Sequence, residues 1–290
     1  MLKKRGYFLF PDPEDKGVQE AFKEGIFQSF ERHSRVGIPT EKGFLEDIDW
    51  LRSQGAKHVI LKTGAYRASD VAFTMKLASE AKIEAVTFDG AGGGTGMSPV
   101  PMMDEMSTPT VYLEAQVLKC TEILRKKGRH VPDVVMAGGF IKETQMFKAI
   151  AMSNFGEGPY VKAVLMARSP LLTVMKSSYF LELSKKGKLP RTFAERYGTT
   201  PDKFFITAPE LKAKYGKRFN EIPWEAVGLY TYLNERIKVG LMQLMAGARK
   251  WKLDLLDRND LVALTERASK TTGIPLVEEA EEDAIERILD

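Results

Sequence analysis

The pattern of apolar and polar positions divides the chain into three parts. Residues 1–36 are irregular, with one short amphipathic stretch broken at Gly25. In residues 37–178, helical spacing of apolar positions alternates with short apolar runs, which predicts helices and strands in turn. Residues 179–290 show no strand pattern. We therefore predict an irregular N-terminal segment, an α/β domain and a helical C-terminal appendage.

Four parallel strands are predicted in the middle part. They lie at 58–62, 86–89, 133–139 and 160–168. The helices between them are expected to begin after Thr40, at Ser69 or Asp70, at Pro109 and at Glu143. The apolar faces of the second and third helices are predicted at Val71, Met75, Leu77 and Ala78, and at Val111, Ala115, Leu118 and Ile123. Because each run is almost continuously apolar, we expect a sheet that is buried on both faces.

In the C-terminal part, amphipathic helices are predicted over 230–251 and 260–270. An acidic helix is expected around EEAEEDAIERILD at the end of the chain. The charged runs of this part are typical of solvated helix faces.

The stretch 86–99, VTFDGAGGGTGMSP, carries the most informative pattern. An apolar run ends at Asp89, and five glycines follow at 90, 92, 93, 94 and 96. Glycine is needed where the backbone adopts positive φ or passes close to a ligand. The carboxyl ends of parallel strands are where α/β proteins bind cofactors. The spacing matches neither common nucleotide-binding glycine motif. We favour a ligand-binding loop over a flexible surface loop.

Composition and charge narrow the class of function. The 290 residues are 43% apolar and 28% charged, as in soluble globular proteins. The net charge of +4 comes without a concentrated basic patch, which argues against nucleic acid as a partner. The single cysteine, Cys120, rules out an internal disulfide and a multi-cysteine metal site, and fits a reducing, cytoplasmic compartment. Neither a membrane-spanning run nor metal-ligand spacing is present.

Four motifs together resemble the FMN-binding domain of glutamate synthase. They are LKTGAYR at 61–67, DGAGGGTGMSP at 89–99, MAGGF at 136–140 and YVKAVLMAR at 160–168. The shorter glutamate synthase-related proteins of bacteria and archaea resemble the chain more closely, and the likeness runs from about Arg32 to the C-terminus. It implies a (β/α)8 TIM barrel of which this chain supplies strands five to eight, a partial barrel with a helical appendage.

The resemblance implies FMN as the cofactor. In such barrels a phosphate binds at the loops after strands seven and eight. Here these are Gly138-Gly139 and Ala167-Arg168, where small residues let the backbone approach and Arg168 supplies a bidentate charge. A surface salt bridge is the alternative role for Arg168. The remaining cofactor-binding residues are predicted to be Lys62, Asp89, Gly90, Gly92, Gly93, Gly94 and Thr95.

Three side chains are predicted to take part in catalysis. Lys62 is the last residue of the predicted apolar strand. The resemblance implies a lysine on this strand beside the flavin, where a cation stabilises the anionic reduced ring. The alternative is a lysine that extends to solvent. Glu114 and Gln116 correspond to an acidic and amide pair that the family carries near its substrate. Asp89 is expected to bond the ribityl hydroxyls or its own glycine loop. Cys120 is expected in the core, and no metal is expected.

By resemblance, the reaction is the reduction of 2-iminoglutarate, formed from 2-oxoglutarate and ammonia, to glutamate. Two alternatives are a related FMN enzyme that makes an N-substituted glutamate, and a truncated, non-catalytic half-barrel that binds a partner. The iron–sulfur cysteine cluster and the N-terminal cysteine of the large synthases are absent. We therefore expect separate subunits to supply electrons and ammonia. Four strands alone leave edges unpaired, so we also expect a complementary half-barrel chain or self-association.

Overall fold

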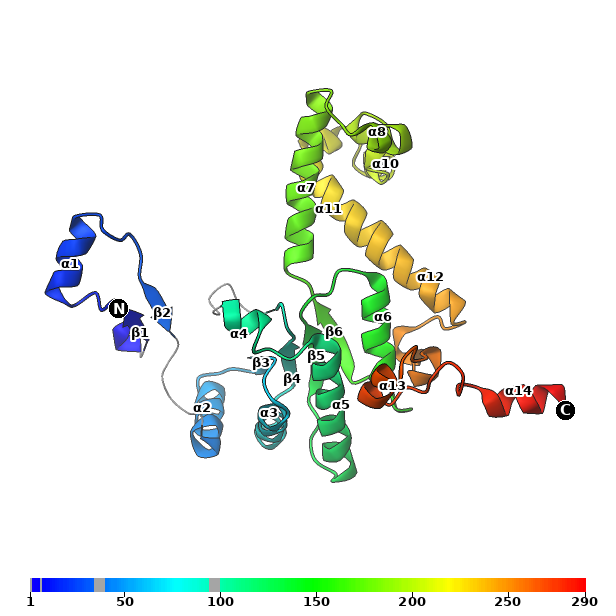
Figure 1. Cartoon of the computed structure of the whole chain (residues 1–290), viewed down its shortest axis with the longest axis horizontal. Coiled ribbons are helices and arrows are strands. Elements are labelled where there is room, and N and C mark those ends of the chain that lie inside the picture. Colours follow the sequence, from blue (N-terminus) through cyan, green and yellow to red (C-terminus); the bar gives the residue numbers. More distant parts are fainter. Residues whose placement is uncertain (1, 6, 34–39, 94–99) are drawn as a thin grey trace. The chain divides into compact units, whose positions relative to one another are not determined.

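The computed structural model describes residues 2–5, 7–33, 40–93 and 100–290 (Figure 1). These residues form two compact units, one that extends to Lys57 and one that begins at His58. The predicted domain boundaries at 36 and 178 stay predictions. Among the described residues, no helix combines the length and the apolar character needed to cross a membrane.

The first unit contains two short strands and two α-helices. Its elements are η1 (Lys3–Arg5), β1 (Phe8–Phe10), α1 (Lys16–Lys23), β2 (Glu31–His33) and α2 (Glu41–Ser53). β1 and β2 pair antiparallel, with Leu9 opposite Arg32. The sequence pattern missed this pair because strands of three residues are too short to show an alternation.

The helix predicted after Thr40 is confirmed as α2. The Thr40 hydroxyl accepts a hydrogen bond from the Gly43 amide at 3.1 Å, which satisfies one of the free N–H groups at the start of the helix. Gly55 lies just beyond the end of the helix with φ +94°, a conformation that favours glycine. Local sequence signals therefore set both ends of this element.

The second unit is built on a four-stranded parallel sheet. Its strands are β3 (Ile60–Gly64), β4 (Ala85–Asp89), β5 (Asp133–Ala137) and β6 (Val161–Leu165), paired in the order β3-β4-β5-β6. The intervening helices are α3 (Ala68–Glu80), α4 (Val100–Asp104), α5 (Thr110–Lys126) and α6 (Glu143–Met152). This confirms the α/β class and the four parallel strands. With right-handed crossovers, a sequential strand order places the crossover helices on one face of the sheet.

The two faces of the sheet differ strongly in exposure. On the helix side, Val86, Phe88, Val134 and Met136 are fully buried. On the opposite side, Ile60 of β3 is 66% exposed and Leu165 of β6 is 45% exposed. The expectation of a sheet buried on both faces, with a buried strand at 58–62, is therefore wrong for the edge strands. Each edge strand has only one neighbouring strand, and the crossover helices cover only the other face.

Several predicted helix details are also corrected. α3 begins at Ala68 with Arg67 in the N-cap position, so neither Ser69 nor Asp70 caps it. The predicted buried face of α3 is confirmed.

In α5, the predicted face residues Val111 and Ile123 are about half exposed. The residues of α5 that are buried are Leu113, Glu114, Val117, Leu118 and Thr121. Leu118 is therefore confirmed, and contacts with α3 and the strands select the other buried positions.

Residues after β6 form the predicted helical region. Its α-helices are α7 (Arg168–Lys185), α8 (Arg191–Tyr197), α9 (Pro201–Phe204), α10 (Ala208–Tyr215), α11 (Trp224–Thr231), α12 (Gly240–Gly247), α13 (Glu266–Thr272) and α14 (Glu282–Leu289). The other turns are η2 (Gly216–Glu221), the π-helical η3 (Tyr232–Val239), η4 (Leu253–Leu255) and η5 (Arg258–Asp260). The predicted helix over 230–251 is part of the run from α11 to α12, and the one over 260–270 begins only at Glu266.

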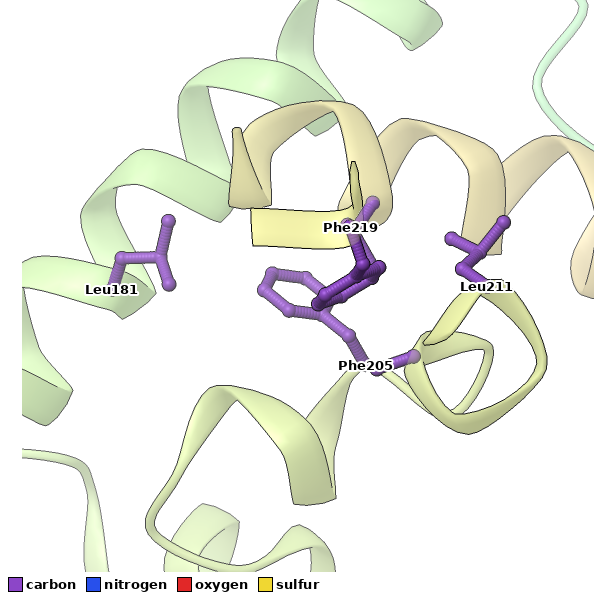
Figure 2. Packing of buried hydrophobic residues seen from close by; sticks show 6 residues of the cluster. Leu181, Phe205, Leu211 and Phe219 are labelled. Atoms are coloured by element: carbon purple, nitrogen blue, oxygen red, sulfur yellow. The ribbon is translucent and has the colours of Figure 1, made fainter. Parts of the chain in front are cut away.

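An aromatic core holds the first part of this region together. α7 and α11 lie side by side (Figure 1). Figure 2 shows Leu181, Phe205, Leu211 and Phe219, which belong to one buried cluster with Ala208 and Val227. The helical region thus has a hydrophobic core of its own beyond the sheet.

Polar contacts attach the helical region to α6. The Tyr232 hydroxyl donates to the Ile141 carbonyl at 2.6 Å. Arg236 Nε lies 3.0 Å from Glu143 Oε2, on a carboxylate side chain that is only 9% exposed. These contacts fix the π-helical turn against the start of α6.

Candidate active site

Two glycine turns meet at the carboxyl ends of β4 and β5. The Gly90 amide donates to the Ala137 carbonyl at 2.9 Å. A Cβ on Gly90 would lie 2.1 Å from Thr110 Oγ1. Gly138 has φ +100°, and a Cβ there would lie 2.6 Å from the Gly90 nitrogen. These positions need glycine because the two backbones are in direct contact.

A third segment, the start of α7, reaches the same place. A Cβ on Gly92 would lie 3.6 Å from Arg168 Nη2, so the guanidinium extends over the loop that follows β4. Arg168 is the first residue of the 18-residue helix α7, and the N-terminus of a helix attracts anions. Among the described residues, Arg168 has no acidic partner. The arrangement suits an anionic group.

The strand predicted over 160–168 is shorter than expected. β6 ends at Leu165, Ala167 is the N-cap of α7, and Arg168 is helical. The prediction that Ala167 and Arg168 end a strand is therefore wrong. The apolar run continues from strand into helix without a turn residue, so sequence pattern did not mark the boundary. Because Arg168 begins α7, an anion beside it would be attracted both by the guanidinium charge and by the positive end of the helix dipole.

Lys62 forms an ion pair on the side of the sheet away from the helices. Its Nζ lies 2.8 Å from Asp89 Oδ2, with side-chain exposures of 43% for Lys62 and 9% for Asp89. Alternation along β3 and the strand register place Lys62 in line with Thr87 and Val135 on that face. Lys62 is thus half exposed and paired. Its predicted role beside a flavin stays a prediction.

Asp89 also determines the shape of its own loop. A Cβ on Gly93 would lie 1.9 Å from Asp89 Oδ1, so the carboxylate occupies the space where a side chain would stand. The Gly93 amide donates to the Gly90 carbonyl at 2.8 Å, which closes a tight turn. Asp89 therefore contacts both the glycine loop and Lys62. Gly94 and Thr95, also predicted to bind the cofactor, lie outside the described residues.

Glu114 and Gln116 do not form a pair in the structure. Residues two positions apart on an α-helix point about 200° apart. Glu114 is 3% exposed, and burial raises the pKa of its carboxyl well above the ordinary value of 4.5. Glu114 Oε1 and Gln116 Oε1 are both buried without a hydrogen-bond partner among the described residues. The predicted catalytic roles of these two residues stay predictions.

Gln145 is a site residue that the sequence analysis missed. Its Oε1 accepts hydrogen bonds from the amides of Ile141 and Lys142 at 2.8 and 2.9 Å, and its Nε2 donates to the Gly139 carbonyl at 3.3 Å. This side chain fixes the loop that follows β5. The signal for it was a glutamine in the first turn of α6, the position from which a capping side chain reaches back.

Other candidate groups have simpler surroundings. Cys120 is partly buried, and burial raises the pKa of its thiol, which makes it a poor nucleophile. In the part of the chain that the structure describes, no cluster of three or more His, Cys, Asp and Glu side chains is placed to hold a metal ion.

Residues 33–163 match the family model described as the conserved region in glutamate synthase. The matched segment, residues 33–163 of the 290, is therefore similar to the conserved region of glutamate synthases. The match contains β3, β4 and β5 with their loops and ends within β6. Comparison with curated proteins gives no match.

The glutamate synthase segment and the site overlap only in part. Lys62, Asp89 and the glycine turns at 90–93 and 138–139 lie inside the matched residues. Arg168 and the helical region lie beyond them. The site therefore combines a family segment with a residue that the family match does not reach.

Proposed function

We propose that this chain is the FMN-bearing part of a glutamate synthase-type oxidoreductase that reduces 2-iminoglutarate, formed from 2-oxoglutarate and ammonia, to glutamate. The observation that carries the proposal is the meeting of Arg168 with the glycine turns at the carboxyl ends of β4 and β5, mostly inside a glutamate synthase segment. A charged helix N-terminus over close-packed glycines is a site for a phosphate.

The residues present fit FMN. Gly138-Gly139 and Arg168 would hold the phosphate, because a Cβ on Gly139 meets no atom within 4 Å and Arg168 has no acidic partner among the described residues. Lys62 would lie beside the flavin ring, held in place by Asp89 at 2.8 Å. FMN, when bound, supplies the hydride for reduction of the imine. The chain's own part is to bind the phosphate and to hold a cation near the ring.

Titration of the apoprotein with FMN tests the phosphate site. Arg168→Ala should weaken binding at least tenfold, because it removes a charge-assisted contact of about 1.5 to 3 kcal/mol. Lys185→Ala, at the other end of α7, is the matched control and should bind as wild type does. Gly139→Asp should lose binding more completely, since it adds a negative charge beside the phosphate. Unchanged affinity in Arg168→Ala and Gly139→Asp would contradict the proposal.

The reduction potential of bound FMN tests Lys62. Lys62→Met should lower the potential by about 20 to 40 mV, the equivalent of about 1 to 2 kcal/mol for two electrons. Lys162→Met removes an exposed lysine of β6 and is the control. Equal potentials in wild type and Lys62→Met would limit Lys62 to a structural role.

We also propose that the open side of the sheet is covered by association, with a complementary half-barrel chain or with a second copy. The exposed Ile60 and Leu165 on the edge strands support this proposal. Light scattering on the purified chain, alone and with candidate partner chains from neighbouring genes, should give a mass above 32.5 kDa. A flavin-loaded monomer that binds no hydrophobic dye would contradict it.

A further inference from the structure

The carbonyl groups of the loop that follows β5 are engaged by side chains. Thr110 Oγ1, from the start of α5, donates to the Gly138 carbonyl at 2.7 Å. Gln145 Nε2, from the first turn of α6, donates to the Gly139 carbonyl at 3.3 Å. Two helices on the covered side of the sheet therefore take the first two carbonyls of the loop.

The helical region takes the next two carbonyls. Ser169 Oγ, from the first turn of α7, donates to the Phe140 carbonyl at 3.2 Å. The Tyr232 hydroxyl, from η3, donates to the Ile141 carbonyl at 2.6 Å. Since Ser169 directly follows Arg168, its hydrogen bond also ties the start of α7 to this loop. Both donors lie beyond the matched residues 33–163.

The amides of the same loop are not all engaged. Those of Ile141 and Lys142 donate to Gln145 Oε1 at 2.8 and 2.9 Å. Those of Gly139 and Phe140 have no acceptor in the part of the chain that the structure describes. A peptide is planar, and its C=O and N–H point in opposite directions. Engaging the two carbonyls that precede these amides therefore turns both amides away from the donating side chains.

η3 is itself held firmly against the start of α6. Arg236 Nε lies 3.0 Å from Glu143 Oε2, on a carboxylate that is almost fully buried. A Cβ on Gly240 would lie 2.8 Å from Glu143 Cγ, so the start of α12 passes close to α6 only because residue 240 is glycine. These contacts fix the position from which Tyr232 reaches the loop.

We propose that the four side chains that engage these carbonyls are positioning residues for the FMN phosphate. They keep the amides of Gly139 and Phe140 available to the phosphate, and they act only through the backbone of the loop. A carbonyl oxygen repels a phosphate, whereas backbone N–H groups attract it. The inference rests on the proposed function, and it makes the helical region beyond the family match a part of the phosphate site.

Affinities for FMN and for riboflavin, measured by fluorescence titration of the full chain, test this inference. Riboflavin lacks only the phosphate, so the ratio of the two affinities reports the phosphate site alone. Wild type should bind FMN at least about tenfold more tightly than riboflavin. Thr110→Val and Tyr232→Phe each remove one hydroxyl, and each should lower this ratio about threefold or more while leaving riboflavin affinity unchanged.

Two variants serve as controls. Thr110→Ser keeps the hydroxyl and should retain the ratio of wild type. Tyr230→Phe removes a hydroxyl of the same helical region that donates to Glu210 at 3.0 Å instead, and it should also retain the ratio.

The outcomes separate this inference from the proposed function. A wild-type ratio in both Thr110→Val and Tyr232→Phe would overturn the inference and leave the FMN site standing. Equal losses of FMN and riboflavin affinity in these variants would also overturn it, because the hydroxyls would then only stabilise the fold. Equal affinities of wild type for FMN and riboflavin would overturn the phosphate site itself, and the positioning role with it.

Discussion

The two faces of the four-stranded sheet differ in burial, although the same strands supply both. On the helix side, Val86, Phe88, Val134 and Met136 are fully buried, and α5 contacts both of their strands. On the other side, the edge strands present Ile60 and Leu165 to solvent, and Lys62 of β3 pairs with Asp89 at the end of β4. The helix-covered face therefore contributes most of the buried apolar packing of the sheet, whereas the open face presents the groups that can bind a ligand or a partner.

The largest contrast is expected from truncating one large side chain on each side. Phe88→Ala should lower the free energy of unfolding by about 3 to 5 kcal/mol, because it leaves a cavity in a packed core. Ile60→Ala should change it by no more than about 0.5 kcal/mol, because Ile60 is 66% exposed. Urea denaturation of both variants measures the difference. Equal effects would show that the open side is covered in the isolated chain.

The glycine turns at the strand ends should give the next largest effect. Gly138→Ala should cost about 2 to 4 kcal/mol, because φ +100° strains an alanine and its Cβ meets the backbone of Gly90. Gly139→Ala is the matched control. It has φ +77° but open space around the added atom, so it should cost about 1 kcal/mol. Similar values for the two would argue against direct contact between the loops.

The free energy of unfolding should depend on pH through Glu114 of α5 but not, between pH 5 and 8, through Glu122 of the same helix. Burial raises the pKa of Glu114 in the folded state, so the folded chain holds a proton that the unfolded chain releases above about pH 4.5. Its contribution to stability is full below that pH and falls as pH rises, by at most about 1.4 kcal/mol per unit. Relative to Glu114→Gln, wild type should therefore lose stability from pH 5 to 8, as urea denaturation measures.

Glu122 provides the control for that experiment. Hydrogen bonds from Arg125 lower the pKa of its carboxyl, so its stabilising effect is present above the unfolded pKa and is lost only as pH falls. Wild type and Glu122→Gln should differ by a constant amount from pH 5 to 8. A constant difference for Glu114→Gln as well would mean that Glu114 is solvated.

The smallest effect is expected on the open side. Lys62→Met should lower the free energy of unfolding by about 0.5 to 1 kcal/mol, because the ion pair with Asp89 is partly screened by solvent. Lys162 of β6 is exposed and has no ion pair among the described residues, so Lys162→Met should have almost no effect. A loss of several kcal/mol in Lys62→Met would place the pair in a buried environment.

The sequence by itself determined the elements that depend on local signals. α6 was predicted from Glu143 to Met152 and has these bounds, and Thr40 caps α2 as expected. Four parallel strands followed from short apolar runs spaced by helices, and the density of glycines marked the loops that meet at the strand ends. Capping and periodicity act within a few residues, so a linear pattern contains them.

Only the tertiary structure decided which surfaces are covered and which side chains meet. An apolar edge strand and an apolar central strand have the same pattern, so the exposure of β3 could not be predicted from residues 58–62. The pairing of Lys62 with Asp89 and the burial of Glu114, whose Oε1 has no hydrogen-bond partner in the described part of the chain, depend on segments far apart in the sequence. Burial and pairing are properties of packed neighbours, which the order of residues along one element does not specify.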